Sequence, residues 1–217
     1  MLKALKGREK KDSFQPIFSF MLLAIKYFLH NCSMLETNFS PFPEIQTQRL
    51  LLRRMVLTDA PEVMALRSNE AAMQYVDRPR TKTIEEAEAW IKMVDESLNN
   101  NNGIAWAITL AAKPNELIGN ISFWRIIKEH YRAEVGYMLS PAHWRTGVMK
   151  EALLAVHDFG FKQMQLHSIE AHINPANKAS AAILESVGYT REAYFKEDYF
   201  FKGTFRDTAI YSLLVDR

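Results

Sequence analysis

The stretch "AEVGYMLSPAHWRTGVMKEALL" (residues 133–154) joins a strand pattern to a helix pattern through a turn that contains Gly147. Residues 133–140 alternate as a strand does, and apolar residues recur at helical spacing from Val148 onwards. Glycine at this junction permits a positive φ angle and a close approach to the backbone. A strand that enters a helix through such a turn presents backbone N–H groups to which a phosphate can bind.

The anion-binding hypothesis assigns the backbone donors to six consecutive residues. They are Arg145, Thr146, Gly147, Val148, Met149 and Lys150. The alternative is ordinary turn chemistry, because glycine is common in turns that bind nothing. The stretch contains neither GxxxxGK[ST] nor GxGxxG, so it is not one of those two nucleotide-binding loops.

A second polar group follows in "NPANKASAAILESVGY" (residues 174–189). Asn174 ends a strand pattern, and Asn177 and Ser180 lie one helical turn apart at the start of a helix. Their amides could bind an extended ligand that carries amide groups, and Ser180 could give a proton to a leaving group. The alternative is that Asn177 is only an N-cap and Ser180 only a polar residue of the first turn.

Strand and helix patterns alternate from Arg49 to the end of the chain. Their order is β, α, α, β, β, β, α, β, α, β, β, which predicts an α+β fold with a mixed sheet. Two helix starts, Asp59 with Glu62 and Thr83 with Glu86, have the spacing of capping boxes. Strands are predicted at 49–56, 104–111, 116–128, 133–140, 168–174, 189–195 and 205–214, and helices at 59–69, 84–98, 147–161 and 177–188.

The composition is that of a globular protein with one main domain: 217 residues, of which 48% are hydrophobic and 24% charged. Residues 1–33 hold six basic and two acidic residues, which leaves 21 basic and 23 acidic residues in 34–217. A nucleic-acid partner is therefore not expected, because phosphate-backbone binders carry a basic face. The single cysteine fits a cytoplasmic protein, and the histidines lack the spacing of metal ligands.

Residues 1–44 are expected to form an extension in front of the main domain, which we place at 45–217. The apolar run within 16–29 is interrupted by Lys26, and it is shorter than the roughly 20 residues that a spanning helix needs. Met34 offers a second start, so we expect the extension to be dispensable or mis-assigned. An amphipathic helix that contacts a membrane surface through 16–29 and a packed appendage are the two alternatives.

The two quoted stretches together resemble the GNAT acetyltransferase superfamily, and closely its RimJ/RimL-type branch, which includes ribosomal-protein N-terminal acetyltransferases. The resemblance runs from about Ile45 to Leu214 and includes "QTQRLLLRRM" and "LIGNIS". It implies the GNAT fold, a mixed and mostly antiparallel sheet whose central strands splay apart between flanking helices. The pyrophosphate loop of the superfamily falls on residues 144–149, although Trp144 and Met149 depart from the usual pattern.

The resemblance implies direct transfer of an acetyl group from acetyl-CoA to a primary amine. The backbone of Tyr137, Met138 and Leu139 would pair with the pantetheine arm, and Asn174 and Asn177 would belong to the same cofactor site.

Two residues take catalytic roles by this resemblance. Ser180 matches the general acid, and Glu134 lies where some members have a catalytic glutamate, although a solvated outward side chain is the alternative for Glu134. Glu197 and Asp198 are alternative bases, because Tyr199 takes the place of the carboxylate that ribosomal-protein acetyltransferases have there.

The expected acceptor is a protein N-terminal α-amine. The alternatives are a small amine, such as a polyamine, an amino acid or an aminoglycoside, or a non-catalytic GNAT module that binds acyl-CoA. The slightly acidic main domain suits basic acceptors of either kind. The resemblance also allows a homodimer.

Overall fold

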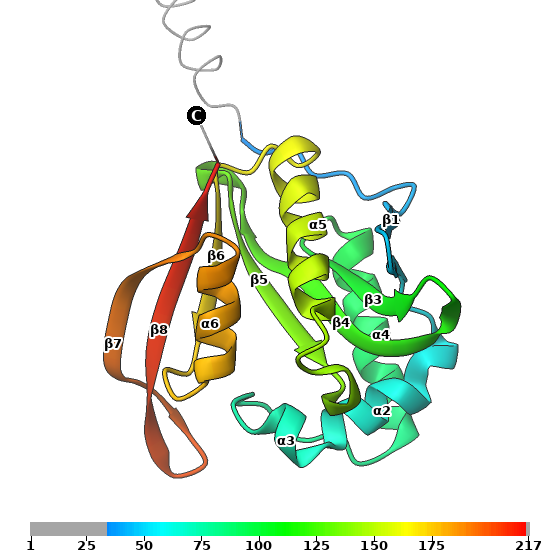
Figure 1. Ribbon diagram of the computed structural model, residues 1–217, viewed down its shortest axis with the longest axis horizontal. Helices are drawn as coiled ribbons and strands as arrows, with labels where there is room; N and C mark the ends of the chain where they lie inside the picture. The colour runs from blue at the N-terminus through cyan, green and yellow to red at the C-terminus, as the bar shows by residue number, and fades with distance from the viewer. Residues whose placement is uncertain (1–33, 216–217) are drawn as a thin grey trace, which may run out of the picture. The chain divides into compact units, whose positions relative to one another are not determined.

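The computed structural model describes residues 34–215, in which eight strands form one sheet in the order β1-β2-β3-β4-β5-β6-β8-β7 (Figure 1). The strands are β1 (Ile45–Gln46), β2 (Leu50–Arg54), β3 (Ile104–Leu110), β4 (Lys113–Ile127), β5 (Arg132–Leu139), β6 (Ser168–Ile173), β7 (Thr190–Phe201) and β8 (Thr204–Leu214). All neighbours are antiparallel except β5 and β6, which are parallel. The predicted α+β class with a mixed, mostly antiparallel sheet is confirmed.

Helices cover both faces of this sheet, with α5 and α6 in front of it and α2 and α4 behind it in Figure 1. The helices are α2 (Ala60–Ser68), α3 (Glu70–Met73), α4 (Ile84–Asn99), α5 (Val148–Lys162) and α6 (Lys178–Ser186). Side chains alternate along β5, so Val135 and Tyr137 pack on the α5 side while Met138 packs on the α2 and α4 side. No helix within residues 34–215 has the length and hydropathy needed to cross a membrane.

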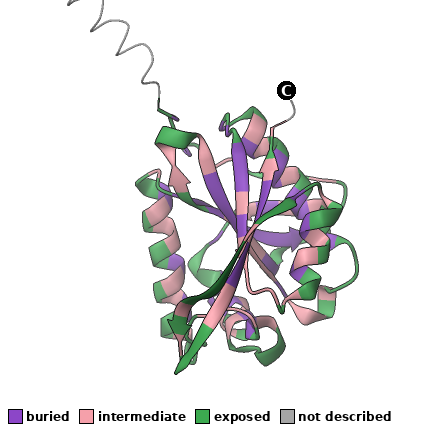
Figure 2. Cartoon of the chain, turned by 90° about the vertical axis from the view of Figure 1, so that its left-hand side faces the viewer, coloured by how far each residue is buried: buried purple, intermediate pink, exposed green. Residues whose placement is uncertain are grey.

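The larger core is built around Trp106 on β3, which is fully buried. Its ring makes edge contacts with Phe42, Phe123 and Phe159, and its Nε1 donates a 2.7 Å hydrogen bond to the carbonyl of Pro43. Figure 2 shows the buried residues concentrated in the central strands.

Residues 35–44, which the sequence assigned to the extension, contribute to this core. Leu35 and Phe39 are each only 4% exposed, and both belong to the cluster that surrounds the indole ring. The expectations for residues 1–33 lie outside the described part of the chain.

The two predicted capping boxes behave differently. Thr83 caps α4 as expected, since its hydroxyl accepts the N–H of Glu86, but the Glu86 carboxylate accepts the N–H of Lys82 rather than that of Thr83. The pair of Asp59 with Glu62 is wrong. Asp59 is buried, and its carboxylate accepts two hydrogen bonds from Arg53, at 2.6 and 2.8 Å. An unpaired buried carboxylate costs more free energy than an exposed helix end without a cap, so the pairing with Arg53 is favoured.

The central strands β5 and β6 pair over only three residues each, Arg132–Glu134 with Ser168–Glu170. Beyond this point β5 continues beside β4 and β6 continues beside β8. The predicted splay of the two strands is confirmed, and residues 135–139 have one edge without a strand partner.

His157 on α5 makes the stability of the fold depend on pH. The ring is buried beside Tyr189, whose hydroxyl lies 3.0 Å from Nε2, and burial lowers the pKa of His157 to about 4. The unfolded chain binds this proton near pH 6.5 and the folded chain does not. The free energy of unfolding therefore falls as the pH drops from about 6.5 towards 4, by about 3 kcal/mol in total.

We expect His157→Gln to remove this part of the pH dependence in urea unfolding measured at pH 7 and at pH 4.5. His130→Gln, a change at an exposed histidine, should leave the dependence as it is in the parent chain. An equal loss of unfolding free energy between pH 7 and pH 4.5 in the parent chain and in His157→Gln would contradict the assignment.

Candidate functional site

A cavity of about 810 Å³ is lined by the end of β5, the turn into α5, the start of α6 and the segment that follows α2. Ten of the thirteen site residues predicted from the sequence line it. They are Tyr137, Met138, Leu139, Arg145, Gly147, Val148, Met149, Lys150, Asn177 and Ser180. The cavity thus adjoins the strand edge that the splay leaves without a partner.

The turn between β5 and α5 has the backbone that the sequence predicted. Gly147 has a φ of 80° and directly precedes Val148, the first residue of α5. Arg145 also has a positive φ, of 61°. Within residues 34–215, no side-chain hydrogen bond caps the start of α5, so its N–H groups keep the capacity to bind an anion.

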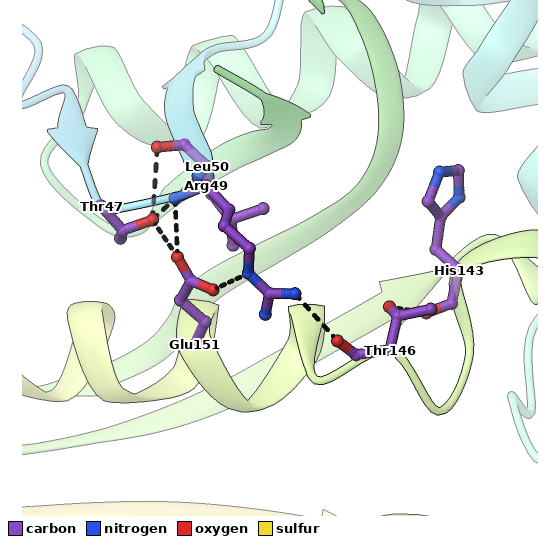
Figure 3. Close-up of polar contacts among 6 residues, drawn as sticks. All are labelled: Thr47, Arg49, Leu50, His143, Thr146 and Glu151. Carbon is purple, nitrogen blue, oxygen red and sulfur yellow. Dashed lines mark hydrogen bonds and ion pairs between the residues drawn. The ribbon is translucent and has the colours of Figure 1, made fainter. Parts of the chain in front are cut away.

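A polar network from the beginning of the domain fixes this turn (Figure 3). Glu151, in the first turn of α5, accepts hydrogen bonds from the Thr47 hydroxyl and from Nε of Arg49, both at 2.6 Å. Nη1 of Arg49 also donates to the carbonyl of Thr146 at 3.0 Å. The lead-in to β2 therefore holds both sides of Gly147, the turn before it and the helix after it.

The same network compensates the charge of Glu151. Burial alone would raise the pKa of this carboxyl, but the hydrogen bonds from Thr47 and Arg49 outweigh burial and lower the pKa. The carboxylate is thus ionised and paired with a guanidinium. A bare negative charge in the first turn would oppose an anion at the helix start, and the pairing with Arg49 offsets that effect.

Two hydroxyl groups meet at the wall of the cavity. The Tyr137 and Ser180 oxygens lie 2.7 Å apart, although the residues belong to β5 and α6. The side-chain oxygen of Asn177 accepts the N–H of Ser180 at 3.0 Å, so Asn177 is the N-cap that the alternative reading expected. Both residues also line the cavity, so capping α6 does not remove them from the site.

Glu134 does not line the cavity, and its side chain lies on the face of β5 opposite to that of Tyr137. It is 6% exposed, so the alternative of a solvated outward side chain is wrong. Its carboxylate lies 3.1 Å from Nη1 of Arg125 and 3.9 Å from Nδ1 of His172. Burial raises the pKa of Glu134, while the neighbouring His172 ring and the Arg125 guanidinium act in the other direction.

Thr146 and Asn174 also lie outside the lining, and both shape turns. The Thr146 hydroxyl donates to the carbonyl of His143 at 2.7 Å. The Asn174 side chain accepts the N–H of Ala176 at 2.9 Å, just before α6.

The segment around α3 also lines the cavity, and sequence reasoning missed it. It contributes Gln74, Tyr75 and Val76 in addition to two alanines. The neighbouring Asp77 accepts a hydrogen bond from the Tyr199 hydroxyl, which connects this segment to the β7–β8 hairpin. The segment has no periodicity or motif from which a site could have been inferred.

Residues 49–190 match the model of the acetyltransferase (GNAT) domain. This chain belongs to the GNAT family. The N-acetyltransferase YoaA of Bacillus subtilis is 33% identical to it over 81% of this chain and 99% of YoaA. The crystal structure of a GNAT-family acetyltransferase from Bacillus anthracis matches this GNAT chain with a TM-score of 0.70 and 28% identity, over 79% of this chain and 98% of that one.

Two further relatives of this GNAT protein are named for their acceptors. The spermidine N(1)-acetyltransferase of Vibrio cholerae is 23% identical over 73% of this chain and 89% of its own length. The [ribosomal protein uS5]-alanine N-acetyltransferase of Escherichia coli is 29% identical over 45% of this chain and 51% of its own. The protein is an acetyl-CoA-dependent N-acetyltransferase. Its two acceptor-named relatives act on different kinds of amine.

Proposed function

We propose that this GNAT enzyme acetylates the α-amino group at the N-terminus of a protein or peptide, as the ribosomal-protein branch does. The observation that carries this choice is the segment that follows α3, where the uncharged residues Gln74, Tyr75 and Val76 line the part of the cavity that is not assigned to the cofactor. A polyamine has several ammonium groups, which carboxylates would hold. A peptide N-terminus has one ammonium group and a row of amides, which Gln74 and Tyr75 can meet with an amide and a hydroxyl.

Acetyl-CoA is assigned to the cavity. The positive φ of Gly147 and the start of α5 suit its pyrophosphate, and the Arg145 and Lys150 side chains add positive charge. The free edge of β5 suits the amides of the pantetheine arm, which would pair there as an added strand does. A backbone N–H near Met138 would then stabilise the oxyanion.

The acid and the base fall on opposite faces of β5. Tyr137 and Ser180 meet on the α6 side, whereas Glu134 points to the other face beside His172. An amine that attacks from the Glu134 side can lose its proton there while the thiol leaves on the Ser180 side. An N-terminal α-amine has a pKa of only about 8, so a carboxylate base has less to do than with an amine of pKa near 10.

Gly147→Val tests the assignment of the cofactor. A side chain here is strained at a φ of 80°, and its Cβ would lie 3.3 Å from Nη2 of Arg49. We expect the dissociation constant of acetyl-CoA, measured by calorimetry, to rise by about tenfold or more, because the turn is forced out of shape. Gly203→Val is the matched control, since Gly203 has the same φ with nothing within 4 Å. A folded Gly147→Val chain with parental affinity would show that the loop is misplaced.

Glu134→Gln tests the base. Only the ionised carboxylate can accept a proton, so the parental kcat/KM should rise with pH through a pKa above the ordinary value for glutamate. In the variant, kcat/KM should fall by about 100-fold and no longer rise with pH through this pKa, while the affinity for acetyl-CoA stays unchanged. If kcat/KM of Glu134→Gln still rises with pH as in the parent chain, the titrating group is another residue.

The acceptor is tested with a panel of peptides that have free N-termini, the same peptides with blocked N-termini, spermidine and an aminoglycoside. Thiol release and product mass are measured together. We expect the best free peptide to exceed spermidine in kcat/KM by about tenfold or more. The reverse order would overturn the peptide assignment in favour of a small amine. Absence of thiol release with every amine of the panel would instead favour the non-catalytic module.

A further inference from the structure

The Tyr137 hydroxyl has no role in the function proposed above, which uses only the backbone of this residue. Its oxygen lies 2.7 Å from that of Ser180, and both residues line the cavity. Within residues 34–215, neither hydroxyl has another recorded hydrogen-bond partner. Ser180 is buried and Tyr137 is partly buried, and the pair borders the place where the acyl donor is assigned.

We propose that Tyr137 and Ser180 form a two-hydroxyl proton relay, in which Tyr137 donates to Ser180 and replaces the proton that Ser180 gives to the departing thiolate. This inference rests on the proposed role of Ser180 as general acid. It adds a second catalytic group, on β5, to a reaction for which the sequence suggested one.

The direction of the relay follows from the chemistry of the two groups. A phenol is a stronger acid than an aliphatic alcohol, so Tyr137 is the natural donor of the shared hydrogen bond. A hydroxyl carries one hydrogen, so a Ser180 oxygen that accepts from Tyr137 keeps its own hydrogen for another acceptor. The cavity is the space that both residues border, and an acceptor in it can receive that hydrogen.

The surroundings keep both members in place and protonated. The N–H bond to Asn177 fixes Ser180 in the first turn of α6, and Tyr137 lies on β5 three residues beyond its last pairing with β6. Burial raises the pKa of Tyr137 to about 12, so the phenol holds its proton at neutral pH, as a proton donor must. Without Tyr137, Ser180 would lack the partner that orients its hydrogen.

The step is balanced in protons and electrons. When the carbon–sulfur bond breaks, its electron pair goes to sulfur, and the Ser180 proton moves to sulfur to give the thiol. The Tyr137 proton moves to the Ser180 oxygen, and the phenolate then takes a proton from solvent. The acceptor ammonium releases two protons in the whole reaction and the thiolate takes one, so one proton is released per turnover.

The first test compares Tyr137→Phe, Ser180→Ala and the double variant. We expect Tyr137→Phe to lower kcat by about tenfold or more, with the dissociation constant of acetyl-CoA within about twofold of the parental value. The double variant should be no slower than Ser180→Ala, because a relay fails as a unit. Tyr189→Phe is the control, since Tyr189 is a buried tyrosine of the same core that lies outside the cavity lining.

The second test separates proton transfer from a purely structural hydrogen bond. Tyr137 is replaced by fluorotyrosines of increasing phenol acidity, which change the volume little. A relay predicts that kcat changes systematically with phenol acidity. A shift of the ¹⁹F resonance in a Ser180→Ala background, without any substrate, checks that the hydrogen bond itself is present. A structural hydrogen bond predicts no trend in kcat.

The outcomes distinguish this inference from the function on which it rests. Full turnover in Ser180→Ala would remove the general acid itself, and the relay with it. Loss of turnover in Ser180→Ala with full turnover in Tyr137→Phe would leave the proposed function intact and overturn only the relay. Losses that multiply in the double variant would show that the two hydroxyls act separately.

Discussion

The separation of β5 from β6 is the constraint on which the rest of the site depends. The two strands share three paired residues each and then diverge, so the backbone groups of residues 135–139 lack a strand partner along one edge. Unpaired backbone groups are costly when they are dry, so this edge requires water or a ligand. The turn into α5 and the start of α6 line the same cavity as this edge, and Gly147 and Ser180 therefore become neighbours of one ligand site.

Side chains alternate along β5, so the polar side chains of this strand lie on opposite faces of the sheet. Tyr137 faces α6, and Glu134 faces away from it towards Arg125 and His172. In the proposed function, one strand thus separates the proton donor from the proton acceptor by the thickness of the sheet, and no loop is needed to position Tyr137 or Glu134. A site built on a strand in this way is more precise than one built on mobile loops.

The sequence predicted those features that are local. Periodicity located the main strands and helices, and the junction at Gly147 predicted the positive φ that the structure has. The splay came from the resemblance, not from periodicity, because no local pattern states where two parallel strands part. The failures have one physical cause. The Asp59 carboxylate binds Arg53 instead of capping its helix. The bonds from Thr47 and Arg49 to Glu151, about 100 positions away, likewise could not be expected from the local sequence. Gln74 and Tyr75 reach the cavity from a segment without any repeating pattern.

The bonds from Thr47 and Arg49 to Glu151 have a consequence for the energetics of ligand binding. The turn before α5 is ordered by the fold itself, so a ligand that binds there does not have to supply the ordering entropy of the loop. The segment between β1 and β2 and the turn before α5 are consequently linked: a ligand that prefers the ordered turn must also stabilise the position of Arg49, by the same free energy. Ligand binding in the cavity and the stability of the beginning of the domain are therefore thermodynamically coupled.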